Sequence, residues 1–344
     1  MADLPTVPAP LRLRLDGEAL VGNFRGCEAR AGVPAIPAVK ADGYGLGARE
    51  VVRRLHGAGA KAFAVATWAE AVALGRADLP LLVLHGFTPD CAAAAAALPL
   101  ARPVLNTVAQ CAAWKAAFPG RPADLMVETG MNRLGVQPAE ISAADGIPVQ
   151  IVHSHFACAD EPGNPLTERQ IARFREVAAA TPGAAHAIAN SAGIHWPGTS
   201  FSAVRPGLSL YGGEAFPAAQ VRRVVTPEAR IIQLRDVAVG EAVGYGATWV
   251  AERPSRIAVL NIGYADGIAR RLGPYLKLHA GGRALPLAGR VSMDMLAADA
   301  TGTELSEGDW VQLDWDLPQL SAASGCSQYE LLVRLGDRFE RIWI

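Results

Sequence analysis

The sequence predicts an α/β fold with an added β region: an N-terminal (β/α)8 barrel followed by a C-terminal, mostly β domain. Two observations predict this arrangement. Over roughly the first 220 of 344 residues, short apolar runs alternate with longer segments of helical period, as in β-α units around a parallel sheet. After about residue 225 the helical period fades, and strand-like runs separated by turns take over. We therefore expect domains at residues 12–225 and 226–344.

Eight strand candidates lie in the first domain. Each is short and apolar or β-branched; they are residues 35–40, 61–67, 80–86, 102–106, 124–129, 149–156, 186–191 and 203–212. Helix candidates lie between them, at residues 48–59, 68–77, 91–98, 107–118 and 166–180. Eight strands alternating with helices suit a barrel. A doubly wound open sheet is the alternative, because periodicity does not separate the two architectures.

The second domain has five strand candidates. They are residues 229–237, 244–252, 255–265, 283–296 and 309–315. Turn-forming residues separate them, which indicates a β domain of short connections.

The composition points to a small-molecule ligand. With 32 basic and 33 acidic residues and a net charge of -1, the chain gives no electrostatic reason to bind nucleic acid or a membrane surface. The alanine run at 91–98 is too short to span a bilayer, and the N-terminus lacks the pattern of a secretory signal. Five scattered cysteines without a C-x-x-C pair fit a reducing cytoplasm.

Polar residues gather where the predicted barrel strands end, which is where active sites of such barrels lie. Strand one ends at Lys40, and strand six at His155. Arg133 follows strand five, Ser191 ends strand seven, and strand eight carries Arg205 and Gly207. Singly, each has a plain explanation, such as a solvated lysine, a helix-capping serine or a turn glycine. Their joint placement favours a site.

Lys40 ends an apolar run, where an ammonium group is costly to bury. A lysine in a low-dielectric pocket has a lowered pKa, and its neutral amine can form a Schiff base with a carbonyl compound. The glycines near Lys40, Ser191 and Gly207 offer backbone N–H and hydroxyl groups suited to a phosphate. A carbonyl compound that carries a phosphate is most economically pyridoxal 5'-phosphate.

Metal chemistry is the rival interpretation. His153 and His155 lie on one side of a strand, as in zinc-dependent barrel hydrolases. However, His186 begins its strand candidate instead of ending it, and no aspartate ends the eighth. We therefore expect no metal ion, and His153 is equally explained by hydrogen bonds in the interior.

The chain resembles the alanine racemase family, the barrel-type pyridoxal phosphate enzymes. Eight motifs carry the resemblance in the family's order, across both domains: AVKADGYGLGA, ETGMNRLGV, HSHFACADE, NSAG, VRPGLSLYG, VGYGATW, IGYADGIARR and GRVSMDM.

The resemblance implies a role for each matched residue of the barrel. Lys40 would carry the cofactor, Arg205 would face its pyridine nitrogen, and Arg133 would lie near its phenolic oxygen and the substrate carboxylate. His155 would lie beneath the ring. The groups around the phosphate would be Tyr44, Ser191, Gly207 and Leu208.

The resemblance also implies a homodimer with shared active sites and the formation of D-alanine. Tyr245 would be the second catalytic residue, and Met293 and Tyr264 would line the substrate pocket of the partner's barrel. Racemisation needs a proton removed from one face of Cα and returned on the other, which suits Lys40 and Tyr245. We expect a cationic neighbourhood, formed by His155 with the support of Arg205, to lower the pKa of Tyr245. Because a guanidinium hardly releases a proton, Arg205 would make the ring a weak electron sink.

Departures from the family pattern limit the resemblance. Met126 stands where many members have a carbamylated lysine that steadies the arginine matching Arg133, so another anchor is needed. Gly43 and Ser292 replace a more usual alanine and cysteine, and Asp337 falls where an extra phosphate-contacting tyrosine is usual.

Other functions stay open on the sequence. A serine or broad-specificity racemase differs by one hydroxyl in the substrate. A decarboxylase on the same two-domain plan and a pyridoxal phosphate carrier on a lone barrel fit the second domain less well.

Overall fold

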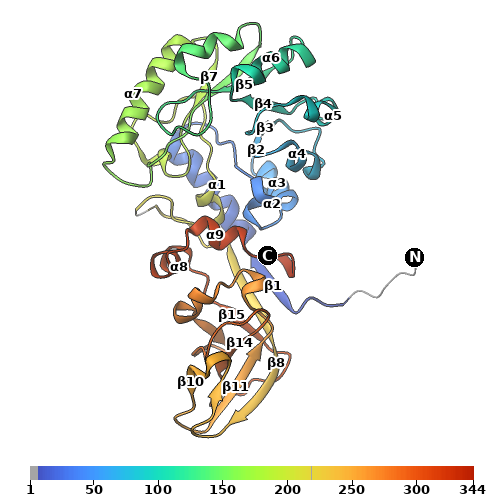
Figure 1. Cartoon of the computed structure of the whole chain (residues 1–344), viewed down its shortest axis with the longest axis vertical. Coiled ribbons are helices and arrows are strands. Elements are labelled where there is room, and N and C mark those ends of the chain that lie inside the picture. Colours follow the sequence, from blue (N-terminus) through green and yellow to red (C-terminus); the bar gives the residue numbers. More distant parts are fainter. Residues whose placement is uncertain (1–6, 218) are drawn as a thin grey trace, which may run out of the picture. The chain divides into compact units, whose positions relative to one another are not determined.

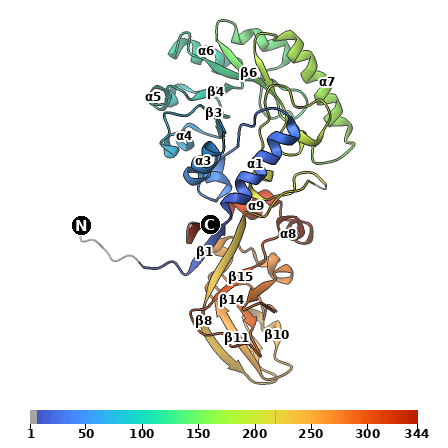
Figure 2. The same ribbon diagram turned by 180° about the vertical axis from the view of Figure 1, so that it is seen from behind.

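The structure is a computed structural model that describes residues 7–217 and 219–344. These residues divide into two compact units: residues 18–222, here the barrel unit, and residues 7–17 with 223–344, here the β unit (Figures 1 and 2). Residues 12–17 and 223–225, expected in the barrel domain, lie in the β unit. Strand β1 (Leu11–Leu15) explains this at the N-terminus, because it pairs with the C-terminal strands β8 (Val225–Val237) and β16 (Phe339–Trp343).

Six parallel strands form the sheet of the barrel unit, and neighbours in the sheet are neighbours in the chain. They are β2 (Phe63–Val65), β3 (Leu81–Val83), β4 (Arg102–Leu105), β5 (Ala123–Met126), β6 (Val149–His153) and β7 (Ala185–Ala187). Residues 34–39 and 202–206 close this sheet into a ring. The closing bonds run from Val39 N to Ala64 O, from Ile36 N to Val204 O and from Arg205 N to Ala189 O. The predicted barrel is confirmed, and the open-sheet alternative is wrong because its edges would not meet.

The first and eighth strand candidates are not continuous strands. Each is reduced to isolated bridges, Ala35 to Val204 and Ala38 to Ala64. Prolines at 34, 37 and 206 explain this, because proline has no N–H to donate to a ladder. The rest of the expected eighth strand is the 3₁₀ helix η4 (Leu208–Tyr211).

The helices of the barrel unit lie outside the strands (Figures 1 and 2). The α-helices here are α1 (Gly17–Ala31), α3 (Ala48–Gly57), α4 (Trp68–Leu74), α5 (Ala92–Ala97), α6 (Val108–Ala117) and α7 (Pro165–Ala180), with α1 starting in the β unit at Gly17. Short 3₁₀ helices are η1 (Pro89–Cys91), η2 (Pro138–Ala144) and η3 (Gly193–His195). All five predicted helices form, and α4 begins with the capping box of Thr67 and Glu70.

One layer of the ring's interior is apolar. One buried cluster takes a side chain from nearly every member of the ring: Ile36, Ala64, Leu82, Val104, Met126, Ala187 and Ala203, with Ile151 of β6 packed against it. The barrel is therefore a filled core and not a pore. On β6, the inward positions that follow Ile151 at a period of two are His153 and His155.

The β unit is built on the long strand β8, which pairs with β1 and β15 in its first half and with β11 in its second half. The other strands are β9 (Ala242–Val243), β10 (Trp249–Val250), β11 (Ser255–Leu260), β12 (Leu278–Ala280), β13 (Arg283–Leu285), β14 (Leu296–Asp299) and β15 (Trp310–Leu313). The helices are η5 (Tyr245–Ala247), η6 (Tyr264–Asp266), η7 (Arg270–Tyr275), α8 (Leu317–Ser324) and α9 (Gln328–Val333).

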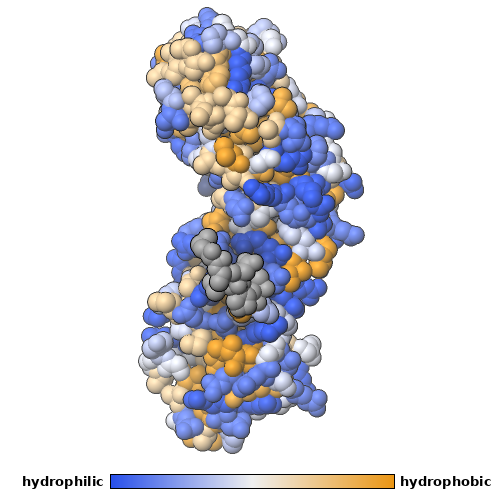
Figure 3. Space-filling model, turned by 90° about the vertical axis from the view of Figure 1, so that its right-hand side faces the viewer, coloured by the Kyte–Doolittle hydropathy of each residue, from blue (hydrophilic) through white to orange (hydrophobic). Residues whose placement is uncertain are grey.

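The strands expected at 244–252 and 283–296 are largely loops. Glycines with positive φ at Gly244, Gly246 and Gly289 turn the backbone there, which a continuous strand does not allow. Over the part of the chain that the structure describes, no helix is both long enough and apolar enough to cross a membrane. Figure 3 shows one side of the molecule, where apolar and polar residues are interspersed.

Candidate active site

Lys40 begins a left-handed backbone turn at the mouth of the barrel. Ala41, Asp42, Gly43 and Tyr44 all have φ between 51° and 63°. Each non-glycine residue in this conformation costs about 1–2 kcal/mol, so the turn must be held by its surroundings. Backbone bonds from Gly43 N to Val39 O and from Gly45 N to Ala41 O contribute.

Two carboxylates also hold this turn. Glu70 accepts the N–H of Ala41 at 2.8 Å and that of Ala66 at 2.6 Å, while it caps α4. Asp42 accepts the N–H of Ala48, near the start of α3, at 2.8 Å. Two acidic side chains, Glu70 and Asp42, therefore fix the backbone beside Lys40.

The pKa of Lys40 is lowered from its ordinary value. Burial of the amine is the largest cause, and the positive charges of Arg133 and Arg205 add to it, while the Glu70 carboxylate opposes it. A partly buried amine in this setting is more often neutral than a surface lysine. This is the property that the sequence predicted for a lysine able to attack a carbonyl carbon.

Ser191, Gly207 and Tyr44 come together beside this turn. The N–H groups of Gly207 and Ser209 donate to Ser191 Oγ, at 2.9 and 3.2 Å. The Tyr44 ring stacks on Tyr211 with a centroid separation of 4.5 Å, and its hydroxyl lies where a Cβ on residue 207 would be. Leu208, buried, begins η4. We call Tyr44, Ser191, Gly207, Leu208 and Ser209 the cradle.

One buried hydroxyl of the cradle has no partner. Within residues 7–217 and 219–344, Ser209 Oγ makes no hydrogen bond although it is buried. An unpaired buried hydroxyl is costly. The cradle thus has a free hydroxyl for a ligand oxygen, as a phosphate would supply.

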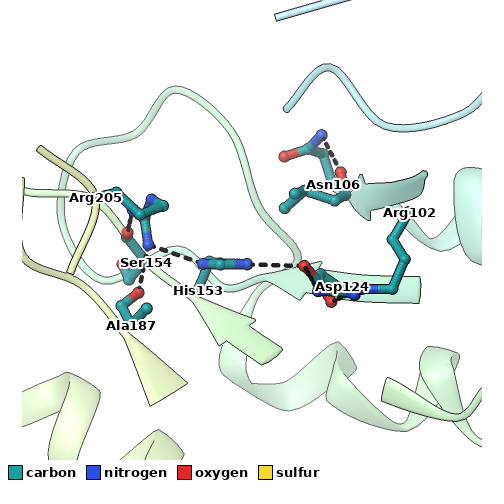
Figure 4. Close-up of polar contacts among 8 residues, drawn as sticks. Arg102, Asn106, Asp124, His153, Ser154, Ala187 and Arg205 are labelled. Carbon is teal, nitrogen blue, oxygen red and sulfur yellow. Dashed lines mark hydrogen bonds and ion pairs between the residues drawn. The ribbon is translucent and has the colours of Figure 1, made fainter. Parts of the chain in front are cut away.

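Arg205, 6% exposed, crosses the ring from the eighth position toward β6 and β7 (Figure 4). Its NH1 group donates to Ala187 O at 2.7 Å and to His153 Nδ1 at 2.8 Å; its NH2 group donates to Ser154 O at 2.5 Å and lies 3.5 Å from His155 Nδ1. A guanidinium has five N–H groups, so these contacts engage four. Among the described residues, the Nε–H is the one left for a ligand.

These contacts fix the protonation of both histidines. Arginine only donates, so Nδ1 of His153 and of His155 must be the acceptor, and the proton of each neutral ring is on Nε2. Burial and the nearby arginines lower the pKa of His153 to about 4; the same causes, with Lys40, lower that of His155 to about 3. Burial and three neighbouring cations therefore oppose protonation of His155, so within the expected cationic neighbourhood the positive charge lies on Arg205 and not on this ring.

The environment of His153 also disfavours the zinc interpretation. Both of its ring nitrogens are engaged, one by Arg205 and the other by Asp124 at 3.2 Å. A search of the described residues for three or more histidine, cysteine, aspartate or glutamate side chains placed to hold a metal ion finds no such group.

Arg133 is exposed, and its backbone N–H lies 3.4 Å from a carboxylate oxygen of the buried Glu128. Met126, at the position of the family's lysine, belongs instead to the apolar interior of the ring. The anchor of this loop in the barrel unit is therefore Glu128, which binds backbone N–H groups at Gly130 and Arg133.

Tyr245, Tyr264 and Met293 lie on loops of the β unit and are exposed by 70%, 41% and 54%. Two of these loops are joined, because Tyr264 N donates to Ser292 O and Ala265 N to Met293 O, each at 3.0 Å. Arg338 spans both loops with a bidentate pair to Asp266 and a third bond to Asp294. The structure thus brings Tyr264 and Met293 together within the β unit.

Sequence reasoning missed Glu70, Asp124, Arg102 and Arg338. Arg102 and Asp124 each begin a predicted apolar strand, and a charge within such a strand was an available signal. Glu70 was recognisable only as a helix cap, and Arg338 had no signal in the sequence, because its partners are 72 and 44 residues away.

The fold and this site define a class of barrel enzyme: a lysine of lowered pKa at the mouth of a (β/α)8 barrel, a cradle of hydroxyl and backbone N–H groups beside it, and a separate β unit. Residues 15–215 match the alanine racemase N-terminal domain family, and residues 224–343 match the alanine racemase C-terminal domain family. The chain therefore belongs to the alanine racemase family.

Individual relatives agree with this assignment. The chain is 38% identical to an alanine racemase of Acidiphilium cryptum over 96% of this chain and 98% of that protein. It is similar to the crystal structure of a Bartonella henselae alanine racemase with covalently bound pyridoxal phosphate, at 30% identity and a TM-score of 0.87 over 98% of this chain and all of that one. The biosynthetic alanine racemase of Pseudomonas aeruginosa has 36% identity and a TM-score of 0.84 over the same shares.

Proposed function

We propose that this chain is an alanine racemase that interconverts L-alanine and D-alanine with pyridoxal 5'-phosphate. The observation that carries the proposal is the Lys40 amine, of lowered pKa, beside a cradle that contains the unpartnered hydroxyl of Ser209. The family and the pyridoxal phosphate of the Bartonella structure support the cofactor, and the names of the relatives support alanine as the substrate.

The residues present fit the cofactor. Lys40 would hold its carbonyl carbon, the cradle its phosphate, and the remaining Nε–H of Arg205 its ring nitrogen. When bound, pyridoxal phosphate withdraws electrons from Cα of the attached amino acid and makes the α-proton acidic. Because a guanidinium donates a hydrogen bond without giving up its proton, Arg205 limits this withdrawal and favours prompt return of the proton to Cα.

Lys40 Nζ would exchange the proton on one face of Cα, and the hydroxyl of Tyr245 on the other. Tyr245 is 70% exposed in the β unit, and the glycines on either side of it, Gly244 and Gly246, face Arg290, three residues before the exposed Met293. The loop of Met293 is joined to that of Tyr264, which is also exposed. Exposed apolar groups gathered in this way favour contact with another chain. We infer a homodimer in which each barrel receives the partner's Tyr245, and in which Arg133, Tyr264 and Met293 bind the substrate.

His155 would assist Tyr245 as a neutral ring. Its Nδ1 faces Arg205, so its Nε2–H is available to donate to a phenolate oxygen. A hydrogen bond to the charged form lowers the pKa of a phenol, and Arg205 strengthens the donor without charging it.

The five free cysteines are in keeping with a cytoplasmic location.

The direct test is the loss of optical rotation from L-alanine by the purified chain, with and without added pyridoxal phosphate. We expect racemisation that depends on the cofactor and disappears in Lys40→Ala. A screen of other L-amino acids identifies a serine or broad-specificity racemase. Cofactor binding without racemisation of any amino acid would reject the proposal in favour of a carrier.

A further inference from the structure

A buried chain of hydrogen bonds extends from Arg205 through His153 and Asp124 to Arg102 (Figure 4). Arg205 NH1 donates to His153 Nδ1 at 2.8 Å, and His153 Nε2 donates to Asp124 Oδ2 at 3.2 Å. Arg102 closes the chain, with Nε 2.9 Å from Asp124 Oδ1. His153 and Asp124 are fully buried. None of these three side chains belongs to the cradle or is assigned a role in the proposed proton transfers.

The chain of bonds has one possible direction. Both arginines are donors, so Asp124 must accept from two sides, and His153 must accept from Arg205 and donate to Asp124. Asp124 therefore selects the tautomer of His153 with its proton on Nε2. This tautomer places a lone pair, and not a second N–H, in front of Arg205 NH1.

We propose that His153 and Asp124 are positioning residues for Arg205, and that the tautomer of His153 set by Asp124 holds the guanidinium with its Nε–H directed at the cofactor. The part of this proposal that directs the Nε–H at the cofactor rests on the proposed function. Fixing this group matters because a planar guanidinium rotated about its long axis would present a different edge to the ring nitrogen. Asp124 also balances the buried charge, since it is the carboxylate that raises the pKa of Arg205 against the effect of burial.

Asp124→Asn tests the direction of the chain. The new amide has one oxygen, and the charged Arg102 forms a stronger hydrogen bond to it than the neutral His153 does. The amide nitrogen then faces His153 and donates to Nε2, so the proton of His153 must move to Nδ1. There it opposes an N–H of Arg205, and the guanidinium must turn.

The first measurement uses the full chain without cofactor. Long-range 1H–15N spectra of the histidines, with His153 assigned by its absence in His153→Asn, give the tautomer directly. We expect the wild type to be neutral with its proton on Nε2 at pH 7, and Asp124→Asn to carry it on Nδ1. A wild-type ring protonated on Nδ1, or an unchanged tautomer in Asp124→Asn, would overturn the proposal whatever the enzyme's activity.

The second measurement uses the chain loaded with pyridoxal phosphate labelled with 15N in its ring. In Asp124→Asn and His153→Leu we expect the ring-nitrogen signal to move toward that of the free cofactor. We also expect kcat for L-alanine to fall by about 10- to 100-fold, the range usual for lost supporting hydrogen bonds, with KM within about twofold. His153→Asn, which keeps an acceptor for Arg205, should recover part of the signal and of kcat.

Trp114→Phe is the matched control. Trp114 is fully buried, its indole donates to Arg121 O at 3.1 Å, and its ring packs on Phe87 and Phe118. It should lower stability without moving the ring-nitrogen signal. Equal effects of Trp114→Phe and Asp124→Asn on that signal would reduce His153 and Asp124 to a structural role. If the wild type binds no cofactor, the proposed function fails while the tautomer result still stands on its own.

Discussion

The hydroxyl of Tyr44 occupies the space in which a side chain on residue 207 would begin; Tyr44 Cζ is only 2.9 Å from the position of a Cβ there. Gly207 is therefore required by its neighbour. Tyr44 is in turn held by stacking on Tyr211, whose hydroxyl donates to Ala38 O at 2.8 Å.

Gly207→Ala should displace the Tyr44 hydroxyl from the cradle. We expect the affinity for pyridoxal phosphate to fall at least about tenfold, because a positioning error of this size forfeits about 1.4 kcal/mol or more. Titration of the cofactor-free chain measures it. Gly26→Ala on α1, where an added Cβ meets nothing within 4 Å, is the control and should leave the affinity unchanged.

Glu70→Gln should loosen the left-handed turn and change the Lys40 amine. The carboxylate raises the pKa of Lys40, so its neutralisation should lower that pKa further. The pH at which cofactor attachment reaches half its maximal rate should move downward, and stability should fall by about 1–2 kcal/mol for the weakened backbone bonds. Glu176→Gln, exposed on α7, should do neither.

Acid should destabilise the chain through two histidines of the barrel, the buried His153 and the partly buried His155. In the folded state the pKa of His153 is about 4 and that of His155 about 3, whereas an unfolded histidine titrates near 6.5. The unfolded state therefore binds more protons, and the free energy of unfolding should fall as pH drops from about 6.5 toward 4. For His153 the loss is of the order of 3 kcal/mol.

Urea unfolding of the cofactor-free chain at several pH values between 7 and 4 measures this loss. His153→Asn removes one of the two groups and should flatten the dependence. A free energy of unfolding that is constant between pH 7 and 5 would contradict the pKa values given for both histidines.

Mixed dimers test the shared site. Lys40→Ala and Tyr245→Phe should each be nearly inactive. If each site takes Lys40 from one subunit and the partner's Tyr245, unfolding and refolding the two variants together makes half of the dimers mixed, each with one intact site. About a quarter of wild-type activity should return. No recovery in dimers shown to be mixed would place both residues in one chain.

Arg338→Met should disturb the loops of Tyr264 and Met293. Its partner Asp266 is fully buried and receives Arg338 Nε at 2.7 Å and NH2 at 2.8 Å. Because Arg338 itself is half exposed, we expect a loss of about 1–3 kcal/mol, and a rise in KM for alanine larger than the fall in kcat. Arg334→Met, which breaks an exposed pair with Glu330, should cost less than about 1 kcal/mol and leave KM unchanged.

The barrel could be predicted from the sequence because its strands are short apolar runs set apart by amphipathic helices. The same rule failed for residues 244–252, which were predicted as a strand. Their apolar residues lie on a turn made by glycines with positive φ, and the pattern of side chains does not predict this backbone conformation. The meeting of Lys40, His155, Ser191, Arg205 and Gly207 followed from strand ends alone. The roles assigned to these residues, and to Tyr245, Tyr264 and Met293, stay predictions.

The charge states of the site residues could not be predicted from the sequence. The neutrality of His155 depends on Arg205, Arg133 and Lys40 facing it together, and on burial, neither of which a strand pattern gives. The left-handed turn at Ala41 likewise depends on Glu70, which lies 29 residues away. Features made by distant partners are those for which local sequence carries no signal.

The prolines at 34, 37 and 206 leave a seam in the ring, formed by residues 34–39 and 202–206. These two segments are joined by a few backbone hydrogen bonds, while the neighbouring strands form regular ladders. Amide protons along this seam should exchange with solvent sooner than those of β4 to β6. Since the seam leads directly to Lys40, the segment that bears this lysine has few ladder bonds to break. We therefore expect entry or departure of a bulky prosthetic group to disturb the rest of the barrel wall least at this place.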